Sequence, residues 1–228
     1  MALASFEDRI NDLIGSFIDE NAMDTFLTDG LKELYSVLPP KKLSECTTTT
    51  TLSNSPQTLD LDTVTIGSVF SVTRKNSIGY NQICRFIPSM LSSRVTDPED
   101  LLHATENDPV YFINNAVLNV YPDPTASQIA DVVYLPLPNT VIGHDSSSID
   151  NLPNELEYIV VLYAAIKCAQ ALLAEEEDLE LYVPIIKTLK ADYNQALALL
   201  GVKINQSSEP ESGANQQALL NQMLEYGK

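Results

Sequence analysis

The stretch ELEYIVVLYAAIKCAQALLAEEED, residues 155–178, decides the fold of this 228-residue chain. It predicts a helix of about six turns, by the usual repeat of 3.6 residues. The helix is apolar on nearly every face from Ile159 to Ala174. Such a helix is buried in a large core or between subunits. Because Lys167 and Gln170 interrupt the apolar run, we expect it to be too short and too polar to span a membrane.

A second helix follows from about Leu181, and Pro184 is compatible with it only near its first turn. Its apolar stripe is Ile185, Ile186, Leu189, Tyr193, Leu197 and Leu200. Gly201 is the expected C-cap. The two helices are predicted to form an antiparallel helical hairpin over residues 152–201.

Two further helices are predicted upstream, in residues 5–38. Ser5 is the expected N-cap of the first, with acidic residues in the first turn. Apolar residues recur at helical spacing, restart near Asn21 and end at Pro39-Pro40. The stripes are Phe6, Ile10, Leu13, Ile14, Phe17 and Ile18, and then Met23, Phe26, Leu27, Leu31, Leu34 and Leu38.

Residues 47–138 have the alternation of strands. The five threonines at 47–51 favour an exposed strand or loop. SVFSVTRK and YNQICRFI are predicted strands joined across NSIG, and residues 110–113 and 116–121 pair across Asn114-Asn115. Residues 130–135 form the last strand, before Pro136. Between these strands, TDPEDLLHAT predicts a short helix with Asp97 as N-cap. The expected fold class is α+β, with a small antiparallel β layer.

The C-terminal residues 205–228 differ in composition from the rest. NQSSEPESGANQQ is typical of a flexible linker. ALLNQMLEYG predicts a small amphipathic helix, which at roughly 12 residues is marginal in water alone. We therefore expect this extended tail to dock on a partner through its apolar side, whose candidate residues are Leu219, Leu220, Met223, Leu224 and Tyr226. Residues 1–204 are then the core unit.

The charge is strongly acidic, with 31 Asp and Glu against 13 Lys and Arg, a net charge of -18. Nucleic-acid surfaces need clustered cations, and the basic residues here are scattered, so a conventional nucleic-acid binder is disfavoured. The simpler interpretation is that the negative charge keeps the protein soluble. The more specific interpretation is that it prevents the surface from binding an anionic polymer. Three separated cysteines predict free, mostly buried thiols in a reducing compartment. The N-terminus lacks the features of a signal peptide.

Motifs for catalysis are weak. His103 and His144 have no neighbour at metal-ligand spacing. The GHDSSS loop brings His144, Asp145 and Ser146 together in sequence, but a nucleophile, base and orienting group normally come from distant segments. No phosphate-binding glycine motif is present. The acids Glu175, Glu176, Glu177 and Asp178 are more typical of a solvated face than of a cation site. The sequence predicts no enzyme activity and no cofactor.

The order of these pieces resembles the head-to-tail connector proteins of tailed bacteriophages, also called adaptor or neck proteins. FLTDGLKELYSVLP resembles their N-terminal helix. RFIPSMLSSRVTDPEDLLHATENDPVYFINNAVLNVYPDP resembles their central part, in which an Asp-Pro helix leads into a hairpin that ends in Tyr-Pro. ADVVYLPLP and LPNELEYIVVLYAAIKCAQALLA resemble their last strand and long helix. The resemblance covers most of residues 26–201.

The resemblance implies a virion structural protein of the neck, assembled in the bacterial host cytoplasm. It implies a homo-oligomeric ring, typically of twelve copies, bound beneath the portal protein. The tail or nozzle protein would bind the opposite face, genomic DNA would pass through the channel, and no membrane would be involved. Side-by-side hairpins would then pack between subunits through Ile159, Leu162, Tyr163 and Ile166. Glu175, Glu176, Glu177 and Asp178 would repel the passing DNA.

Two other classes remain open. One is another virion or host α+β interaction module that does not form a ring. The other, less favoured, is a hydrolase that uses the His144 loop or the acidic cluster.

Overall fold

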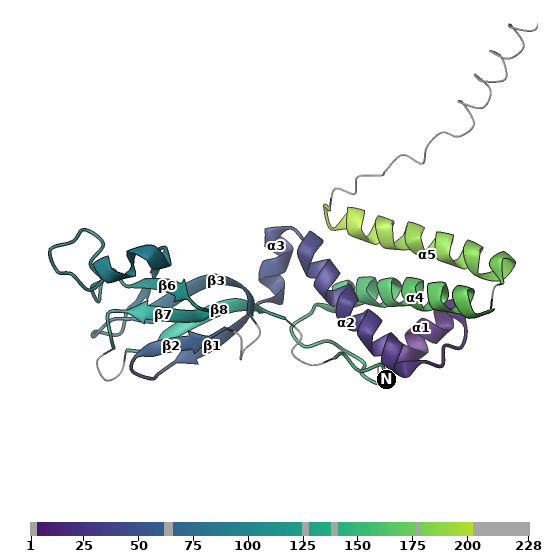
Figure 1. Ribbon diagram of the computed structural model, residues 1–228, viewed down its shortest axis with the longest axis horizontal. Helices are drawn as coiled ribbons and strands as arrows, with labels where there is room; N and C mark the ends of the chain where they lie inside the picture. The colour runs from purple at the N-terminus through teal and green to yellow at the C-terminus, as the bar shows by residue number, and fades with distance from the viewer. Residues whose placement is uncertain (1–3, 62–65, 125–127, 138–140, 177, 203–228) are drawn as a thin grey trace, which may run out of the picture.

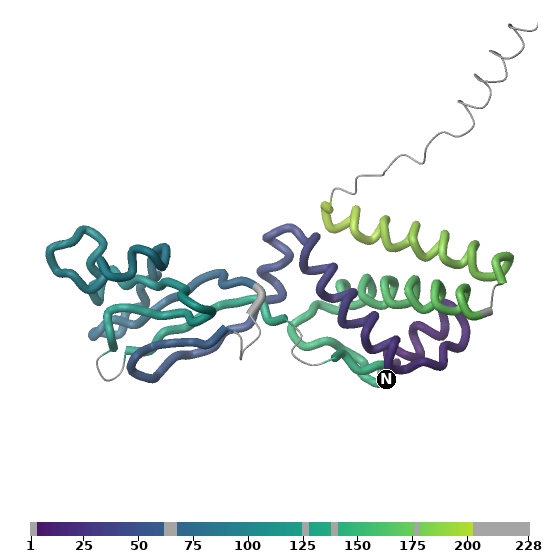
Figure 2. Tube along the Cα trace, in the orientation of Figure 1, coloured from purple at the N-terminus to yellow at the C-terminus, as the bar shows by residue number. Residues whose placement is uncertain are grey.

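The computed structural model describes residues 4–61, 66–124, 128–137, 141–176 and 178–202. They form a helical lobe and a β lobe at opposite ends of an elongated molecule (Figure 1). The chain begins in the helical lobe, crosses into the β lobe and returns, as the colours of the trace show (Figure 2). The helical lobe is therefore built from segments that lie far apart in the sequence.

The long helix α4 (Asn154–Glu176) is the centre of the helical lobe. It packs against α1 (Phe6–Ile14), α2 (Glu20–Val37) and α5 (Leu179–Leu199). The hairpin partner α5 lies on one side of α4, and α1 and α2 lie on the other (Figure 1). The prediction that this segment is too short and too polar to span a membrane is wrong, because α4 is long and apolar enough to cross one by length and composition; 67% of its apolar window is nevertheless buried inside the fold. Its apolar surface is thus explained by the three helices around it.

Local chemistry sets most helix ends near where the sequence predicts them. The first predicted stripe is too long, because α1 ends at Ile14, before Gly15 at φ 89°, and Phe17 and Ile18 lie outside the helix. The Ser5 hydroxyl accepts from the Asp8 amide at 3.1 Å and caps α1. The Asp19 carboxylate caps α2 in the same way, and α2 ends at Val37, ahead of Pro39-Pro40. Gly201, with φ 81°, follows α5, and the Val202 amide closes back on the Leu197 carbonyl at 3.2 Å. This last arrangement is the expected glycine C-cap.

Pro184 lies in the second turn of α5, slightly deeper than the first turn that the sequence favours. The short helix α3 (Pro40–Leu43) and the 3-10 helix η1 (Ser44–Cys46) then lead into the β lobe. Lys42 joins this connection to the start of α4, because its ammonium bonds Glu155 at 2.8 Å and Glu45 at 2.9 Å.

The strands form two four-stranded sheets. The first has the order β1-β8-β3-β4, and the second has the order β2-β7-β6-β5. The bounds are β1 Thr48–Leu52, β2 Gln57–Asp60, β3 Ile66–Lys75, β4 Asn81–Ile83, β5 Arg85–Phe86, β6 Val110–Asn114, β7 Val117–Tyr121 and β8 Ala130–Pro136. The threonine tract is the edge strand β1, paired antiparallel with β8.

The predicted α+β class is confirmed, and the β lobe is more elaborate than a single antiparallel layer. The strands β4 and β5 are separated only by Cys84, so one nearly continuous segment crosses from the first sheet to the second. The second sheet is mixed, because β5 runs parallel to β6 whereas β6 and β2 both run antiparallel to β7. The turn between β6 and β7 also lies one residue later than predicted, at Asn115 and Ala116, which both have positive φ.

The predicted helix at Asp97 is wrong. Residues 97–102 form turns, and a 3-10 helix, η2 (Ser89–Arg94), lies just before them. The Asp97 carboxylate accepts from the Glu99 amide, and the Asp100 carboxylate accepts from the Leu102 amide. Aspartate side chains that bond the backbone two residues on offer the chain an alternative to a helix.

A buried polar network joins the two sheets. Arg74 on β3 is 1% exposed, and its guanidinium donates to the Pro122 carbonyl after β7 and to Gln128 Oε1 at 2.7 Å. Gln57, at the start of β2, is fully buried and donates to the carbonyls of Leu52 and Gln128. The amide of Gln57 therefore fills the space between the adjacent ends of β1 and β2. Burial lowers the pKa of the Arg74 guanidinium from its usual value.

Candidate functional site

Four α4 residues were predicted to pack between subunits. Ile159, Leu162 and Ile166 are buried in the core of this single chain. Tyr163 is partly exposed and packs inside the chain, with its ring 6.3 Å from that of Tyr193 on α5. One chain alone therefore covers most of this surface, and a role between subunits stays a prediction.

The contact between α2 and α4 is very close at Gly30. A Cβ atom built on Gly30 would lie 2.9 Å from Cδ1 of Tyr163. The Lys167 ammonium lies 5.4 Å from the centre of the same ring. A glycine inside a helix is thus required here by packing, because any side chain would displace the tyrosine.

Three of the four predicted acids, Glu175, Glu176 and Asp178, lie at or near the turn between α4 and α5. Glu175 is exposed near the end of α4, and Glu176 ends that helix. Asp178 is the N-cap of α5, and its carboxylate accepts from the Leu181 amide at 3.1 Å. Glu177 lies outside the described residues. Asp178 therefore has a local structural role, whatever it does toward DNA.

The proposed docking residues of the tail, Leu219, Leu220, Met223, Leu224 and Tyr226, also lie outside the described residues. Their role stays a prediction.

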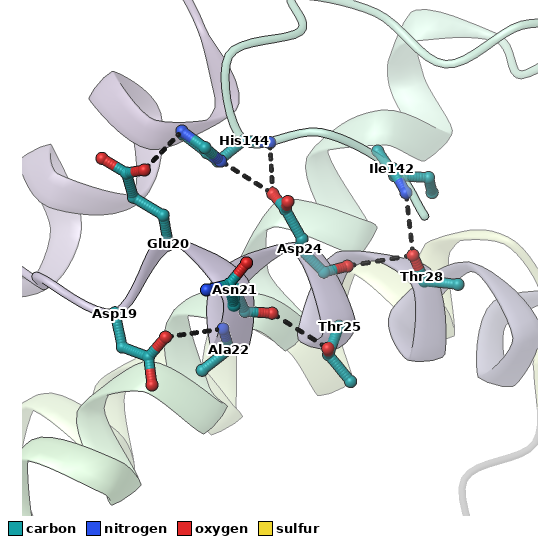
Figure 3. Close-up of polar contacts among 9 residues, drawn as sticks. All are labelled: Asp19, Glu20, Asn21, Ala22, Asp24, Thr25, Thr28, Ile142 and His144. Carbon is teal, nitrogen blue, oxygen red and sulfur yellow. Dashed lines mark hydrogen bonds and ion pairs between the residues drawn. The ribbon is translucent and has the colours of Figure 1, made fainter. Parts of the chain in front are cut away.

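The GHDSSS loop is held against the first two helices (Figure 3). The His144 amide donates to Asp24 Oδ1 at 2.6 Å, and the Ile142 amide donates to the Thr28 hydroxyl at 2.9 Å. On α1, the Phe6 amide donates to the Ser146 carbonyl, and the Glu7 amide donates to the His144 carbonyl. Because this loop leads from β8 to α4, it ties the return of the chain to both N-terminal helices.

The His144 ring lies between two carboxylates (Figure 3). Its Nδ1 is 2.9 Å from Asp24 Oδ1, and its Nε2 is 3.5 Å from Glu20 Oε2. The hydrogen bond to Asp24 raises the pKa of His144, and the charges of Asp24, Glu20 and Glu7 act in the same direction. The ring is thus stabilised in its protonated form.

This geometry does not suit a general base. A base needs a free ring nitrogen within reach of the proton that it abstracts. Both ring nitrogens of His144 face carboxylates, and the nearby Thr28 hydroxyl donates to the Asp24 carbonyl at 2.9 Å. We therefore interpret the His144 loop as a structural clip between segments.

The thiols of the described residues are buried, and burial disfavours the reactive thiolate form. Cys46, Cys84 and Cys168 are free and buried, as predicted. Burial raises the pKa of Cys84 and of Cys168 to about 12, which keeps both thiols protonated and unreactive. No cluster of three His, Cys, Asp or Glu side chains that could hold a metal ion is found among the described residues.

The sequence reasoning missed an exposed apolar surface on the β lobe, which we call the apolar tip. It lies on the β3–β4 hairpin, and its members are Ile78, Tyr80 and Ile83. They are 74%, 67% and 78% exposed, although they lie within six residues. Phe86 and Met90, which follow in β5 and η2, are exposed as well. Exposed apolar clusters of this kind mark interaction sites.

A signal for the apolar tip exists in the sequence. Residues 63–96 contain no Asp or Glu, whereas the chain as a whole has 31 in 228 residues. At that average, a run of this length would hold about five acidic residues. The run is thus a neutral to basic island in an acidic protein.

Comparison with known proteins agrees with an assembly role. The family model described as "SU10 adaptor protein" matches residues 1–218. No curated protein matches the chain.

Proposed function

The chain belongs to the SU10 adaptor protein family of phage head-to-tail adaptors, and from this premise we propose that it forms a ring that joins the portal to the tail. The family match over residues 1–218 carries this proposal. An adaptor of this kind is a structural protein of the virion neck. We further propose that the ring has twelve copies, is assembled in the bacterial cytoplasm, and lets genomic DNA pass through its channel.

The elongated shape supports a role in joining two partners. The helical lobe and the β lobe lie at opposite ends, so each can contact a different component (Figure 1). The described part of the chain ends in the helical lobe, just after α5. We therefore assign the helical lobe and the C-terminal residues 205–228 to the portal. The β lobe is assigned to the phage tail.

Contacts between neighbouring copies are proposed on the helical hairpin. The outer side of α5 is not covered by other described elements, and Leu181 and Leu199 are 51% and 81% exposed. Ile159, Leu162 and Ile166 of α4 lie within the core and would support this contact from behind. The ring would then be closed by head-to-tail contacts between α5 and the next copy.

The acidic turn between α4 and α5 is proposed to keep DNA from sticking to the channel. Repeated in every copy, Glu175, Glu176, Glu177 and Asp178 would repel phosphates, and salt would weaken the effect because the Debye length is about 8 Å at 0.15 M. Replacing the three glutamates with glutamine is expected to slow DNA ejection. Unchanged ejection and retention of DNA would remove this role.

The test of the function is a mixture of the purified chain with its portal protein, followed by electron microscopy. We expect a ring on the portal. A strict monomer that ignores the portal would instead indicate an interaction module without ring assembly.

The role of the C-terminal residues 205–228 in portal docking is tested by truncating the chain at Asn205. The truncated chain is expected to stay folded and to lose portal docking, because residues 219–226 supply the docking helix and several copies engage at once. Normal docking by the truncated chain would show that the tail is not needed.

A further inference from the structure

The apolar tip lies at the end of the β lobe that is remote from the helices. In the first sheet, Thr48 lies two residues after the end of η1 and pairs with Tyr134, close to where β8 leaves for the helical lobe. At the other end of this sheet, Lys75 pairs with Asn81, and the β3–β4 turn projects beyond them. The turn thus lies at the end of the first sheet that points away from the helical lobe.

The β3–β4 turn is firmly built, although its apolar side chains are exposed. The Asn76 side chain is buried, and its Oδ1 accepts from the Tyr80 amide at 2.9 Å. The Asn76 amide donates to the Tyr80 carbonyl at 2.9 Å, and Gly79 adopts φ 88°. Ile78 and Tyr80 are therefore held outward by a hydrogen-bonded turn, which lowers the entropy lost when a partner binds.

Next to the tip, β4 leaves part of its backbone unpaired with β3. The Cys84 amide donates to the Val72 carbonyl at 2.8 Å, so in this antiparallel pair Ile83 points its own backbone groups away from β3. An edge strand of this kind can add hydrogen bonds to an apolar contact. The tip therefore offers both apolar side chains and backbone groups.

Electrostatics define the partner. Two ion pairs border the tip, Arg85 with Asp108 at 2.7 Å and Arg94 with Asp100 at 2.6 Å, and Lys75 lies partly buried at the base of the turn. Glu106 bonds Ser77 and Gln128. The exposed side chains of the tip itself are uncharged, so the tip matches a protein surface of uncharged apolar side chains. A carboxylate buried against them would lose its hydration.

We propose that the apolar tip is the docking surface for a tail-side protein of the virion, which binds through uncharged apolar side chains and an extended segment along β4. This inference rests on the proposed ring, in which equivalent copies stand side by side and all tips point the same way along the axis. A second copy could cover the tip with its own tip only through a twofold contact. Such a contact is not available within that ring.

The test replaces Ile78 and Ile83 with aspartate in the full-length chain. The matched control is Ile18→Asp, because Ile18 is 89% exposed but lies between α1 and α2 in the helical lobe. Each protein is assembled with portal and then mixed with tails released from virions. We expect the double variant to form normal rings on the portal but to bind tails about tenfold more weakly or worse, as loss of central apolar contacts usually does. Ile18→Asp should bind virion tails as the unchanged protein does.

Tail binding by the double variant at the level of the unchanged protein would overturn the proposal. A concentration-dependent dimer of the unchanged chain alone, lost in the double variant, would also overturn it, since the occupant would then be a second copy. If no ring forms on the portal even with the unchanged chain, the proposed function fails. Even in that case, binding of virion tails by the free chain would support the apolar tip as the docking surface, provided that the double variant loses this binding.

A milder variant guards against misfolding. Ile78→Ser changes one exposed residue in the turn, outside any strand, and leaves the hydrogen bonds of Asn76 intact. It should keep the circular dichroism of the unchanged protein and weaken tail binding less than the double variant does. Full tail binding by a folded Ile78→Asp, Ile83→Asp protein and by Ile78→Ser would exclude the tip as the docking surface.

Discussion

The two lobes are held together by different kinds of contact. In the helical lobe, the described core is almost entirely apolar, and Thr28 and Glu157 are its buried polar residues. In the β lobe, Gln57, Arg74, Asn76 and Gln128 are all buried. The helical lobe thus depends on packing around one long helix, whereas the β lobe depends on a hydrogen-bonded network between two small sheets.

This difference predicts how each lobe responds to change. Loss of an apolar side chain removes a graded amount of packing, set by the volume lost. Loss of one member of a buried polar network leaves its partners unpaired, which affects the whole network. Variants in the two lobes can test the contrast directly.

The largest effect is expected at the centre of α4. Leu162 is fully buried, so Leu162→Ala should lower the free energy of unfolding by about 3 kcal/mol, within the usual range for buried leucine. Urea denaturation followed by circular dichroism measures the loss. Leu199→Ala is the control, because Leu199 is 81% exposed on α5 and its loss should change stability by less than about 0.5 kcal/mol. Equal effects would show that α4 is not the centre of the lobe.

The next effect is expected in the β lobe. Arg74→Met keeps the apolar stem but removes the donors to the Pro122 carbonyl and to Gln128. Unpaired buried acceptors cost about 1–3 kcal/mol, although removal of a buried charge offsets part of that loss. Hydrogen exchange at the β3 and β8 amides would locate the loss in the β lobe. The neighbouring Lys75→Met is the control, and a gain in stability in Arg74→Met would mean that the cost of burying the charge is larger.

The helical lobe could be predicted from sequence because each helix carries its own signals. The Ser5 cap, the prolines after α2 and the glycine after α5 act within a few residues, and the apolar stripes have the period of a helix. The sequence could not show that Ile159 and Leu162 would be covered by this chain's own helices. That outcome depends on α1 and α2, which come more than a hundred residues earlier.

The β lobe was less predictable, because sheet pairing depends on distant partners. The strand positions were largely recognised, but nothing local to Arg85 shows that β5 runs parallel to β6. Aspartates at 97 and 100 fit a helix start and an Asx turn equally well, and the tertiary fold selects the turn. The apolar tip cannot be recognised from a motif, because its signal in the sequence is the absence of Asp and Glu over residues 63–96.

Gly30→Ala is expected to have a smaller effect, for a reason specific to helix packing. The added methyl group would lie 2.9 Å from the Tyr163 ring, and overpacking of this kind costs about 1–3 kcal/mol. Alanine gains about 1 kcal/mol in helix propensity, so the net loss should be about 1 kcal/mol. Thermal unfolding measures it. Tyr163→Leu should lower the free energy of unfolding less in the Gly30→Ala variant than in the unchanged protein, because the smaller side chain relieves the clash with the added methyl group.

The smallest effect on stability is expected at the His144 loop, which is held against α1 and α2 and whose histidine can be titrated. Its pKa is raised in the folded chain by Asp24, so its stabilising effect is fully present below the ordinary histidine pKa of about 6.5. That effect is lost as the pH rises through the folded-state pKa. The free energies of unfolding of the unchanged protein and of His144→Gln should therefore differ most near pH 6 and converge toward pH 8.

The glutamine variant keeps the backbone bond to Asp24, so it isolates the charge. Added salt should shrink the difference, because the ring is partly exposed to solvent. A difference that stays constant from pH 6 to pH 8 would assign the role of His144 to packing alone.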